Sequence, residues 1–100
     1  GGYSAAPEQR ASETSVDALS VYPNPFNPST RIEFKLVAPG LVSLRVYDLV
    51  GREVAKLVNG EREAGVHTVV FDASKLPSGV YFSKLEVTGK TTITKLLLLK

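Results

Sequence analysis

The chain has 100 residues, a net charge of +2 and no cysteine. This length allows one domain, and the lack of cysteine excludes disulfides, thiolate nucleophiles and cysteine-based metal sites. So small a charge disfavours nucleic-acid binding, and no apolar run reaches the length of a transmembrane helix. The sequence contains no methionine, so we expect a fragment or a processed product of a longer protein.

The first 17 residues are small and polar and show no sustained apolar period. They carry too little apolar surface to offset the entropy lost on ordering. We therefore expect residues 1–17 to form a flexible tether and residues 18–100 to form one folded domain.

A proline-rich segment with the sequence YPNPFNP follows a short predicted strand at residues 18–22. Proline fixes φ and lacks the N–H that a strand ladder needs, so this segment is neither helix nor central strand. Two interpretations remain open: a recognition loop, or a stiff loop that only fixes how the chain enters the domain. The residues concerned are Asn24, Pro25, Phe26, Asn27 and Pro28.

The rest of the chain alternates between apolar and polar residues in short runs. Ile32, Phe34 and Leu36 alternate with charged residues, which is typical of a half-buried strand at residues 30–36. Further strands are predicted at residues 42–47, 52–58, 67–72, 80–88 and 91–99, with a polar loop at 59–65 and a hairpin tip at 89–90. About seven short strands and no convincing helix predict an all-β fold, an immunoglobulin-like antiparallel β-sandwich.

The last predicted strand ends in four consecutive leucines between two lysines. Such a run places apolar groups on both faces of a strand, whereas a two-layer sandwich covers only one face. It is therefore either a strand buried on both sides or an edge strand used for binding, with the lysines acting as gatekeepers. The candidate recognition residues are Lys95, Leu96, Leu97, Leu98, Leu99 and Lys100.

Candidate catalytic and ligand-binding residues are few. His67 is the only histidine and alternates with Val69 and Phe71, so it is better explained as a packed or rim residue than as a metal ligand. Asp48 and Asp72 both end strands, where turn capping is favoured over a paired-carboxylate site. Tyr81, early in its strand, suits a tyrosine corner. No cofactor or metal is expected. An aromatic platform for sugars would draw on Tyr3, Tyr22, Tyr47 and Tyr81.

Five motifs in one order carry a family resemblance. Residues 22–30 (YPNPFNPST), 46–54 (VYDLVGREV), 64–72 (AGVHTVVFD), 77–82 (PSGVYF) and 95–100 (KLLLLK) resemble the type A C-terminal sorting domain of the bacterial type IX secretion system. The immunoglobulin-like domain of the flagellar hook-capping protein shares the first motif. Ser83 is a mild departure, since an aromatic or aliphatic residue often stands there.

The resemblance implies a non-catalytic, monomeric targeting domain. Members follow a secreted passenger, often a polysaccharide hydrolase or protease, that enters the periplasm by an ordinary signal peptide. An outer-membrane translocon recognises the folded domain, and a cell-surface sortase commonly removes it, so the passenger reaches the cell surface or the medium. Two alternatives remain open: a carbohydrate-binding or adhesion module of a secreted hydrolase, and a structural immunoglobulin-like spacer.

Overall fold

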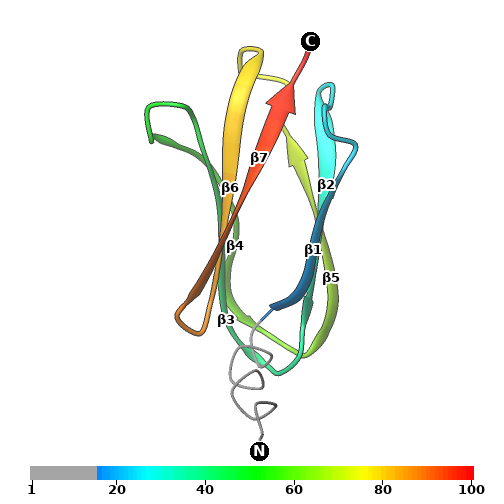
Figure 1. Cartoon of the computed structure of the whole chain (residues 1–100), viewed down its shortest axis with the longest axis vertical. Coiled ribbons are helices and arrows are strands. Elements are labelled where there is room, and N and C mark those ends of the chain that lie inside the picture. Colours follow the sequence, from blue (N-terminus) through cyan, green and yellow to red (C-terminus); the bar gives the residue numbers. More distant parts are fainter. Residues whose placement is uncertain (1–15) are drawn as a thin grey trace, which may run out of the picture.

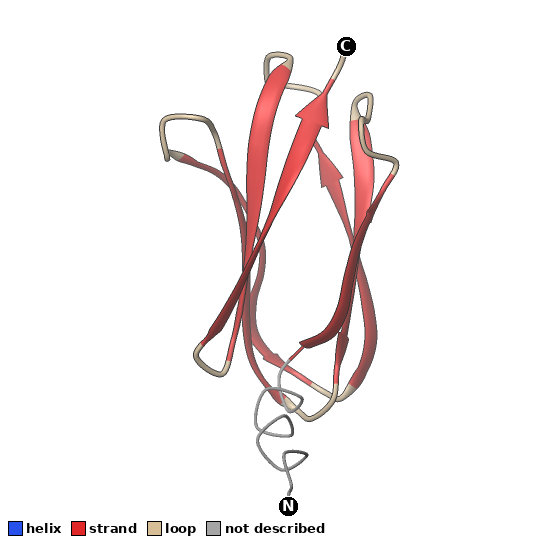
Figure 2. Cartoon of the chain, in the orientation of Figure 1, coloured by secondary structure: helices blue, strands red, loops and turns tan. Residues whose placement is uncertain are grey.

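Seven strands and no helix make up the part of the chain that the computed structural model describes, residues 16–100 (Figures 1 and 2). The strands are β1 (Val16–Tyr22), β2 (Ser29–Leu36), β3 (Gly40–Tyr47), β4 (Glu53–Arg62), β5 (Gly65–Asp72), β6 (Gly79–Val87) and β7 (Lys90–Leu98). Strand β1 thus begins two residues before residue 18, where we expected the folded domain to start. The predicted tether otherwise falls on residues 1–15, which lie outside the described residues.

The strands form two antiparallel sheets that face each other. One sheet has the order β1-β2-β5 and the other has the order β4-β3-β6-β7. This arrangement confirms the predicted immunoglobulin-like β-sandwich. It also makes β7 an edge strand, paired only with β6 from Lys90 to Leu98 without a register shift.

The core lies between the sheets and is built from every second residue of the strands. In β2 the burial alternates without interruption, and Ile32, Phe34 and Leu36 are 0–1% exposed. Leu44 from β3 and Leu85 from β6 face them from the other sheet, also 0–1% exposed. The alternation read from the sequence therefore gave the correct inner faces.

The polar loop predicted at residues 59–65 is wrong. Strand β4 continues to Arg62, because Asn59 and Gly60 pair with Ser43 and Val42 of β3. Gly60 has a φ of 151°, which a residue with a side chain adopts only with strain, so glycine lets the strand continue here. The loop is reduced to residues 63–64.

The β6–β7 hairpin tip also differs from the prediction by one residue. The tip is Thr88-Gly89, since Lys90 already pairs with Val87. Both tip residues have positive φ, 49° and 78°, as a tight two-residue turn of the primed type requires.

The loops gather at two ends of the sandwich. Residues 23–28, 48–52 and 73–78 connect strands at the end where Lys100 lies, which we call the C-terminal end. Residues 37–39, 63–64 and 88–89 connect strands at the opposite end. All the motifs that resemble the sorting domain contribute residues to the C-terminal end or to the strands that reach it.

Candidate interaction site at the C-terminal end

Strand β7 presents its leucines alternately to the core and to the outer face. Leu96 and Leu98 are 0% exposed, whereas Leu97 is half-buried and Leu99 is 52% exposed. The two inner leucines contact the core and cannot meet a partner while the domain is folded. The residues of the predicted recognition segment that lie at the surface are Lys95, Leu97, Leu99 and Lys100.

The proline-rich loop pairs with the edge of this same segment. Phe26 donates its N–H to the carbonyl of Leu97 at 2.9 Å, and Leu99 donates its N–H to the carbonyl of Phe26 at 3.0 Å. Phe26 and Leu98 thereby form a parallel bridge outside the regular strands. A loop 70 residues away in the sequence therefore covers the upper edge of β7, near the C-terminus in Figure 1.

Asn24 extends this pairing with its side chain. Its Nδ2 donates to the carbonyl of Lys95 at 2.9 Å, and its Oδ1 accepts the N–H of Leu97 at 3.0 Å. A carboxamide carries a donor and an acceptor in one plane, so it takes the place of a peptide group in the ladder. The chain can thus kink at Pro23 and Pro25 and still satisfy the edge of β7.

A buried ring and a buried hydroxyl group anchor the proline-rich loop to the core. Phe26 is 2% exposed and its ring centroid lies 5.8 Å from that of Phe71. Thr30, also 2% exposed, donates its hydroxyl to the carbonyl of Pro23 at 2.6 Å. The loop therefore has a structural role, to hold β7. A role for its exposed residues in recognition stays a prediction; those residues are Asn24, Pro25, Asn27 and Pro28.

Lys100 is fixed to the neighbouring loop. Its backbone N–H donates to Oγ of Ser78 at 2.9 Å, and its Nζ donates to the carbonyl of Ser74 at 2.7 Å. Asp72 supports this loop, because its Oδ1 accepts the N–H of Ser74 at 2.9 Å. This hydrogen bond, and then the nearby charges of Lys100 and Lys75, lower the pKa of Asp72.

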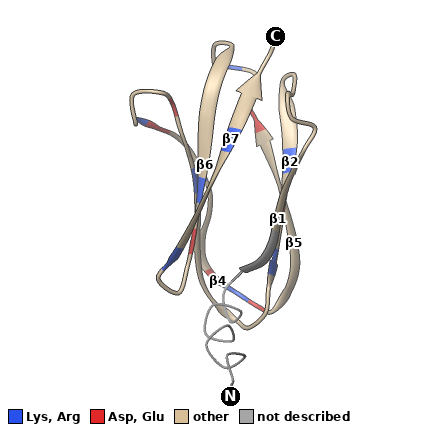
Figure 3. Ribbon diagram, in the orientation of Figure 1, with Lys and Arg blue, Asp and Glu red and all other residues tan. Residues whose placement is uncertain are grey.

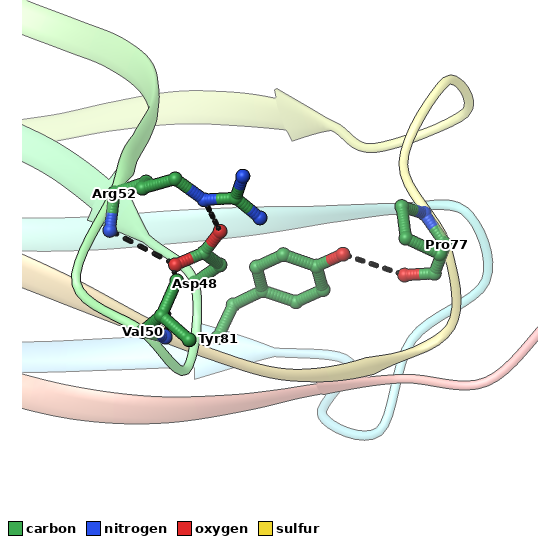
Figure 4. Close-up of polar contacts among 5 residues, drawn as sticks. All are labelled: Asp48, Val50, Arg52, Pro77 and Tyr81. Atoms are coloured by element: carbon green, nitrogen blue, oxygen red, sulfur yellow. Dashed lines mark hydrogen bonds and ion pairs between the residues drawn. The ribbon is translucent and has the colours of Figure 1, made fainter.

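The 48–52 turn is built around a single carboxylate (Figure 4). Asp48 Oδ1 accepts the N–H groups of Val50 and Arg52 at 3.0 and 2.9 Å, and Oδ2 lies 2.8 Å from Nε of Arg52. These hydrogen bonds to the Arg52 backbone and guanidinium hold the pKa of Asp48 below its ordinary value of 3.8. Turn capping, as predicted, is the role of both aspartates.

Tyr81 forms the predicted tyrosine corner. The residue is 4% exposed, and its hydroxyl donates to the carbonyl of Pro77, four residues upstream, at 2.6 Å (Figure 4). Burial, and to a smaller extent the charge of Asp48, raises the pKa of this phenol above 10.0. The contact ties the 73–78 loop to β6, next to β7.

The other candidate residues are placed in structural roles. His67 stacks on Phe34, with ring centroids 5.3 Å apart, and its Nε2 lies 2.7 Å from the carbonyl of Glu63, which agrees with the predicted packed or rim histidine. Within residues 16–100 there is no group of three metal-ligating side chains. Of the tyrosines, Tyr81 is buried, and Tyr22 and Tyr47 lie in different sheets. Tyr3 lies outside the described residues.

Sequence reasoning missed the pairing between the loop and β7. The Asn-Pro alternation indicated a non-regular segment, but nothing in it shows which strand lies beside it. It also missed that Ser83 is 0% exposed with its hydroxyl unpartnered in the described structure. Its position in the alternation of β6, between buried Tyr81 and buried Leu85, was the available signal for that burial.

The fold and the site together define a class: a small immunoglobulin-like β-sandwich whose most constrained surface is built on its last strand. Over residues 20–99 the chain matches the family described as the secretion system C-terminal sorting domain. The chain therefore belongs to this family. No curated protein gives a significant match.

A solved structure supports the fold. It comes from a structural and functional study of PorZ, an essential bacterial surface component of the type IX secretion system of Porphyromonas gingivalis. The two chains superpose with a TM-score of 0.57 at 22% identity, over 84% of this chain and 12% of that chain. This chain thus corresponds to a small part of the PorZ protein.

Family membership gives the coarse function. The domain is a C-terminal sorting domain of a secretion system, which supports a targeting role. Within the described residues, no helix has the length and apolar character needed to cross a membrane.

Proposed function

We propose that the surface formed by Lys95, Leu97, Leu99 and Lys100 is the address by which the type IX translocon recognises this domain. One observation carries the proposal: residues 24–26 and the serines 74 and 78 hold this segment in a fixed arrangement at one end of the sandwich. A contact surface that is ordered before binding avoids the entropy cost of ordering it on binding.

The chemistry of the surface suits a protein partner. Leu97 and Leu99 offer apolar area on an edge strand, and Lys95 and Lys100 supply positive charge on either side of it. Residues 90–100 contain no acidic side chain, so this charge is not cancelled within the strand. A partner with an apolar patch and carboxylates would be complementary.

The rest of the proposed pathway follows the family resemblance. The passenger is a secreted hydrolase, such as a polysaccharide hydrolase or a protease, that first reaches the periplasm. The folded, monomeric domain then engages the outer-membrane translocon, and a cell-surface sortase removes it.

A reporter fusion in a type IX-competent host tests the address. Deleting residues 95–100 should abolish secretion while the reporter accumulates in the periplasm. Because this deletion removes core leucines, the decisive variants are Leu97→Thr with Leu99→Thr, which keep β propensity, and Lys95→Glu. Each should lower the secreted fraction while circular dichroism shows an unchanged fold.

The matched control is Val66→Thr with Val70→Thr. These valines are 60% exposed on β5, in the other sheet, so their replacement removes comparable apolar surface away from the address. The control should be secreted at the wild-type level. If the folded Leu97, Leu99 and Lys95 variants are also secreted at that level, β7 is not the signal, and residues 24–28 become the leading candidate.

No arrangement of the described aromatic residues favours the carbohydrate-module alternative. A pull-down with insoluble xylan or cellulose tests it directly. Saturable binding at micromolar concentration would support a sugar-binding module in place of an address.

A further inference from the structure

The edge of β7 is covered along only half of its length. From Lys95 to Leu99, residues 24–26 satisfy the outward backbone groups through the hydrogen bonds described above. From Lys90 to Thr94, the structure of residues 16–100 shows no strand or loop paired with this edge. Figure 1 shows the lower part of β7 running away from the proline-rich loop.

The alternation of an antiparallel ladder identifies the unpaired groups. Leu97 uses both its N–H and its carbonyl on the outer side, toward residues 24–26. Successive residues of a strand point their backbone groups to opposite sides, and β7 pairs with β6 without a shift. The N–H and carbonyl groups of Thr91 and Ile93, and the N–H of Lys95, therefore point away from β6 along the open edge.

Between Lys90 and Lys95, this stretch lacks the devices that usually protect an edge. Native edges are blunted by charges, prolines or bulges, and β1 and β4 both contain register shifts. Between its two flanking lysines, the open half of β7 has no charge, proline or register shift, and its sequence there, Thr-Thr-Ile-Thr, favours β structure. Ile93 is 62% exposed beside the unpaired groups.

We propose that the open half of β7 accepts an extended, acidic strand of the secretion machinery. This strand pairs with the backbone of Thr91 and Ile93 and stops near Lys95, where the side chain of Asn24 begins to occupy the edge. This proposal rests on the proposed function and names its contact mode. The added strand would extend the sheet beyond β7, in line with the short parallel bridge that Phe26 already makes.

The charge of the edge determines the chemistry of that strand. Lys90 and Lys95 are exposed, and no ion pair involving either is found among the described residues. Lys84, opposite Ile93 on β6, forms an ion pair with Glu86 at 3.9 Å, so Lys90 and Lys95 supply the net positive charge of the edge. Figure 3 shows basic positions, in blue, on β6 and β7. Strand β5 also ends its sheet, but between Gly65 and Asp72 it carries no lysine or arginine.

The test uses the full chain fused to a reporter in a type IX-competent host. Ile93→Pro removes an N–H that points away from β6, so the pairing with β6 survives while the added strand loses a hydrogen bond and meets the proline ring. The secreted fraction should fall by about tenfold. The matched control, Ile93→Thr, removes the apolar side chain but keeps the N–H and should stay within about twofold of wild type.

The charge is tested at the other end of the open edge. Lys90→Glu should also lower secretion by about tenfold, whereas Lys56→Glu, on the edge strand β4 of the same sheet, should leave it unchanged. Folding of each variant is checked by its thermal melt. If Ile93→Pro does not fold, Thr91→Pro removes the next outward N–H and gives the same test.

Each remaining outcome separates the hypotheses. Wild-type secretion of folded Ile93→Pro or Thr91→Pro would overturn strand addition, and the address proposal stands if the Leu97, Leu99 and Lys95 variants still fail. If light scattering shows that the wild-type chain is a dimer and that Ile93→Pro dissociates this dimer, the occupant of the edge is a second copy of the chain. That result would also overturn the addition of a strand from the secretion machinery. Equal loss in Ile93→Thr and Ile93→Pro would assign the effect to the side chain and not to the backbone.

Discussion

The two ends of the sandwich are built on different principles. At the C-terminal end, the connections span residues 23–28, 48–52 and 73–78, and side chains pin each of them: Asn24 and Thr30, Asp48, and Asp72 with Tyr81. At the opposite end the connections are residues 37–39, 63–64 and 88–89, and side-chain hydrogen bonds of Arg62 and His67 lie there. Short turns need only the right φ, whereas longer loops need partners to become ordered.

This small domain concentrates the side-chain hydrogen bonds that order its loops at the C-terminal end. Irregular backbone is kept on a rigid scaffold where proteins place recognition surfaces, and here it surrounds the last strand. The following predictions test whether the C-terminal end is as interdependent as its contacts indicate, starting with the largest expected effect.

Phe26→Ala should cause the largest loss. It leaves a cavity beside Phe71 and removes the anchor of the loop that covers β7, so we expect a loss of about 3–5 kcal/mol in the free energy of unfolding. Leu44→Ala or Phe34→Ala, in the core between the two ends, should cost about 2–5 kcal/mol. Urea unfolding measures all three.

The distinguishing readout is amide hydrogen exchange in β7. In Phe26→Ala the amides of Leu97 and Leu99 should exchange faster relative to those of Leu96 and Leu98, which face β6. Uniform acceleration along β7 would show that the loop does not protect the edge separately from the fold.

Asn24→Ala should have the next largest effect, about 1–2 kcal/mol, because two hydrogen bonds to β7 are lost at a partly solvated edge. Asn24→Asp keeps the acceptor for the N–H of Leu97 but loses the donor to Lys95, so the amide of Leu97 should remain more protected than in Asn24→Ala. Native-state hydrogen exchange measures both. Equal exchange rates in the two variants would contradict the peptide-like pairing.

Two buried side-chain hydroxyl groups on β6 allow a matched pair of substitutions. Tyr81→Phe removes a hydroxyl that is hydrogen-bonded at the C-terminal end and should cost about 1 kcal/mol. Ser83→Ala removes a buried, unpartnered hydroxyl two residues further on and should raise the free energy of unfolding by about 1 kcal/mol. Chemical denaturation measures both signs, and a loss of stability in Ser83→Ala would reveal a partner for that hydroxyl.

The smallest expected effect is on the pH dependence of the unfolding free energy in acid. The pKa values of Asp48 and Asp72 are lowered in the folded chain, so the unfolded chain binds protons first as the pH falls. The stabilisation is therefore complete above the ordinary pKa of 3.8 and is lost as the pH falls through the lower, folded values. Asp48→Asn with Asp72→Asn should flatten the dependence of the unfolding free energy on pH below about pH 4. An unchanged slope in denaturation curves across this range would contradict the assignment.

Local patterns in the sequence determined much of this protein. Alternation of apolar residues gave the seven strands and their inner faces, such as Ile32, Phe34 and Leu36, because a strand repeats every two residues whatever it packs against. The same local logic gave the capping roles of Asp48 and Asp72 and the corner at Tyr81, since each partner lies within four residues. The motif order gave the family.

Only the tertiary structure decided which leucines at the end of the chain are buried and which part of the β7 edge is covered. It placed Leu96 and Leu98 in the core and Leu99 at the surface, a choice that four identical residues cannot encode. It also brought Asn24 and Phe26 to the edge of β7, across more than 70 residues of chain, and left Thr91 and Ile93 uncovered. Edge pairing depends on which strands become neighbours when two sheets stack, and that is a property of the whole fold and not of any one segment.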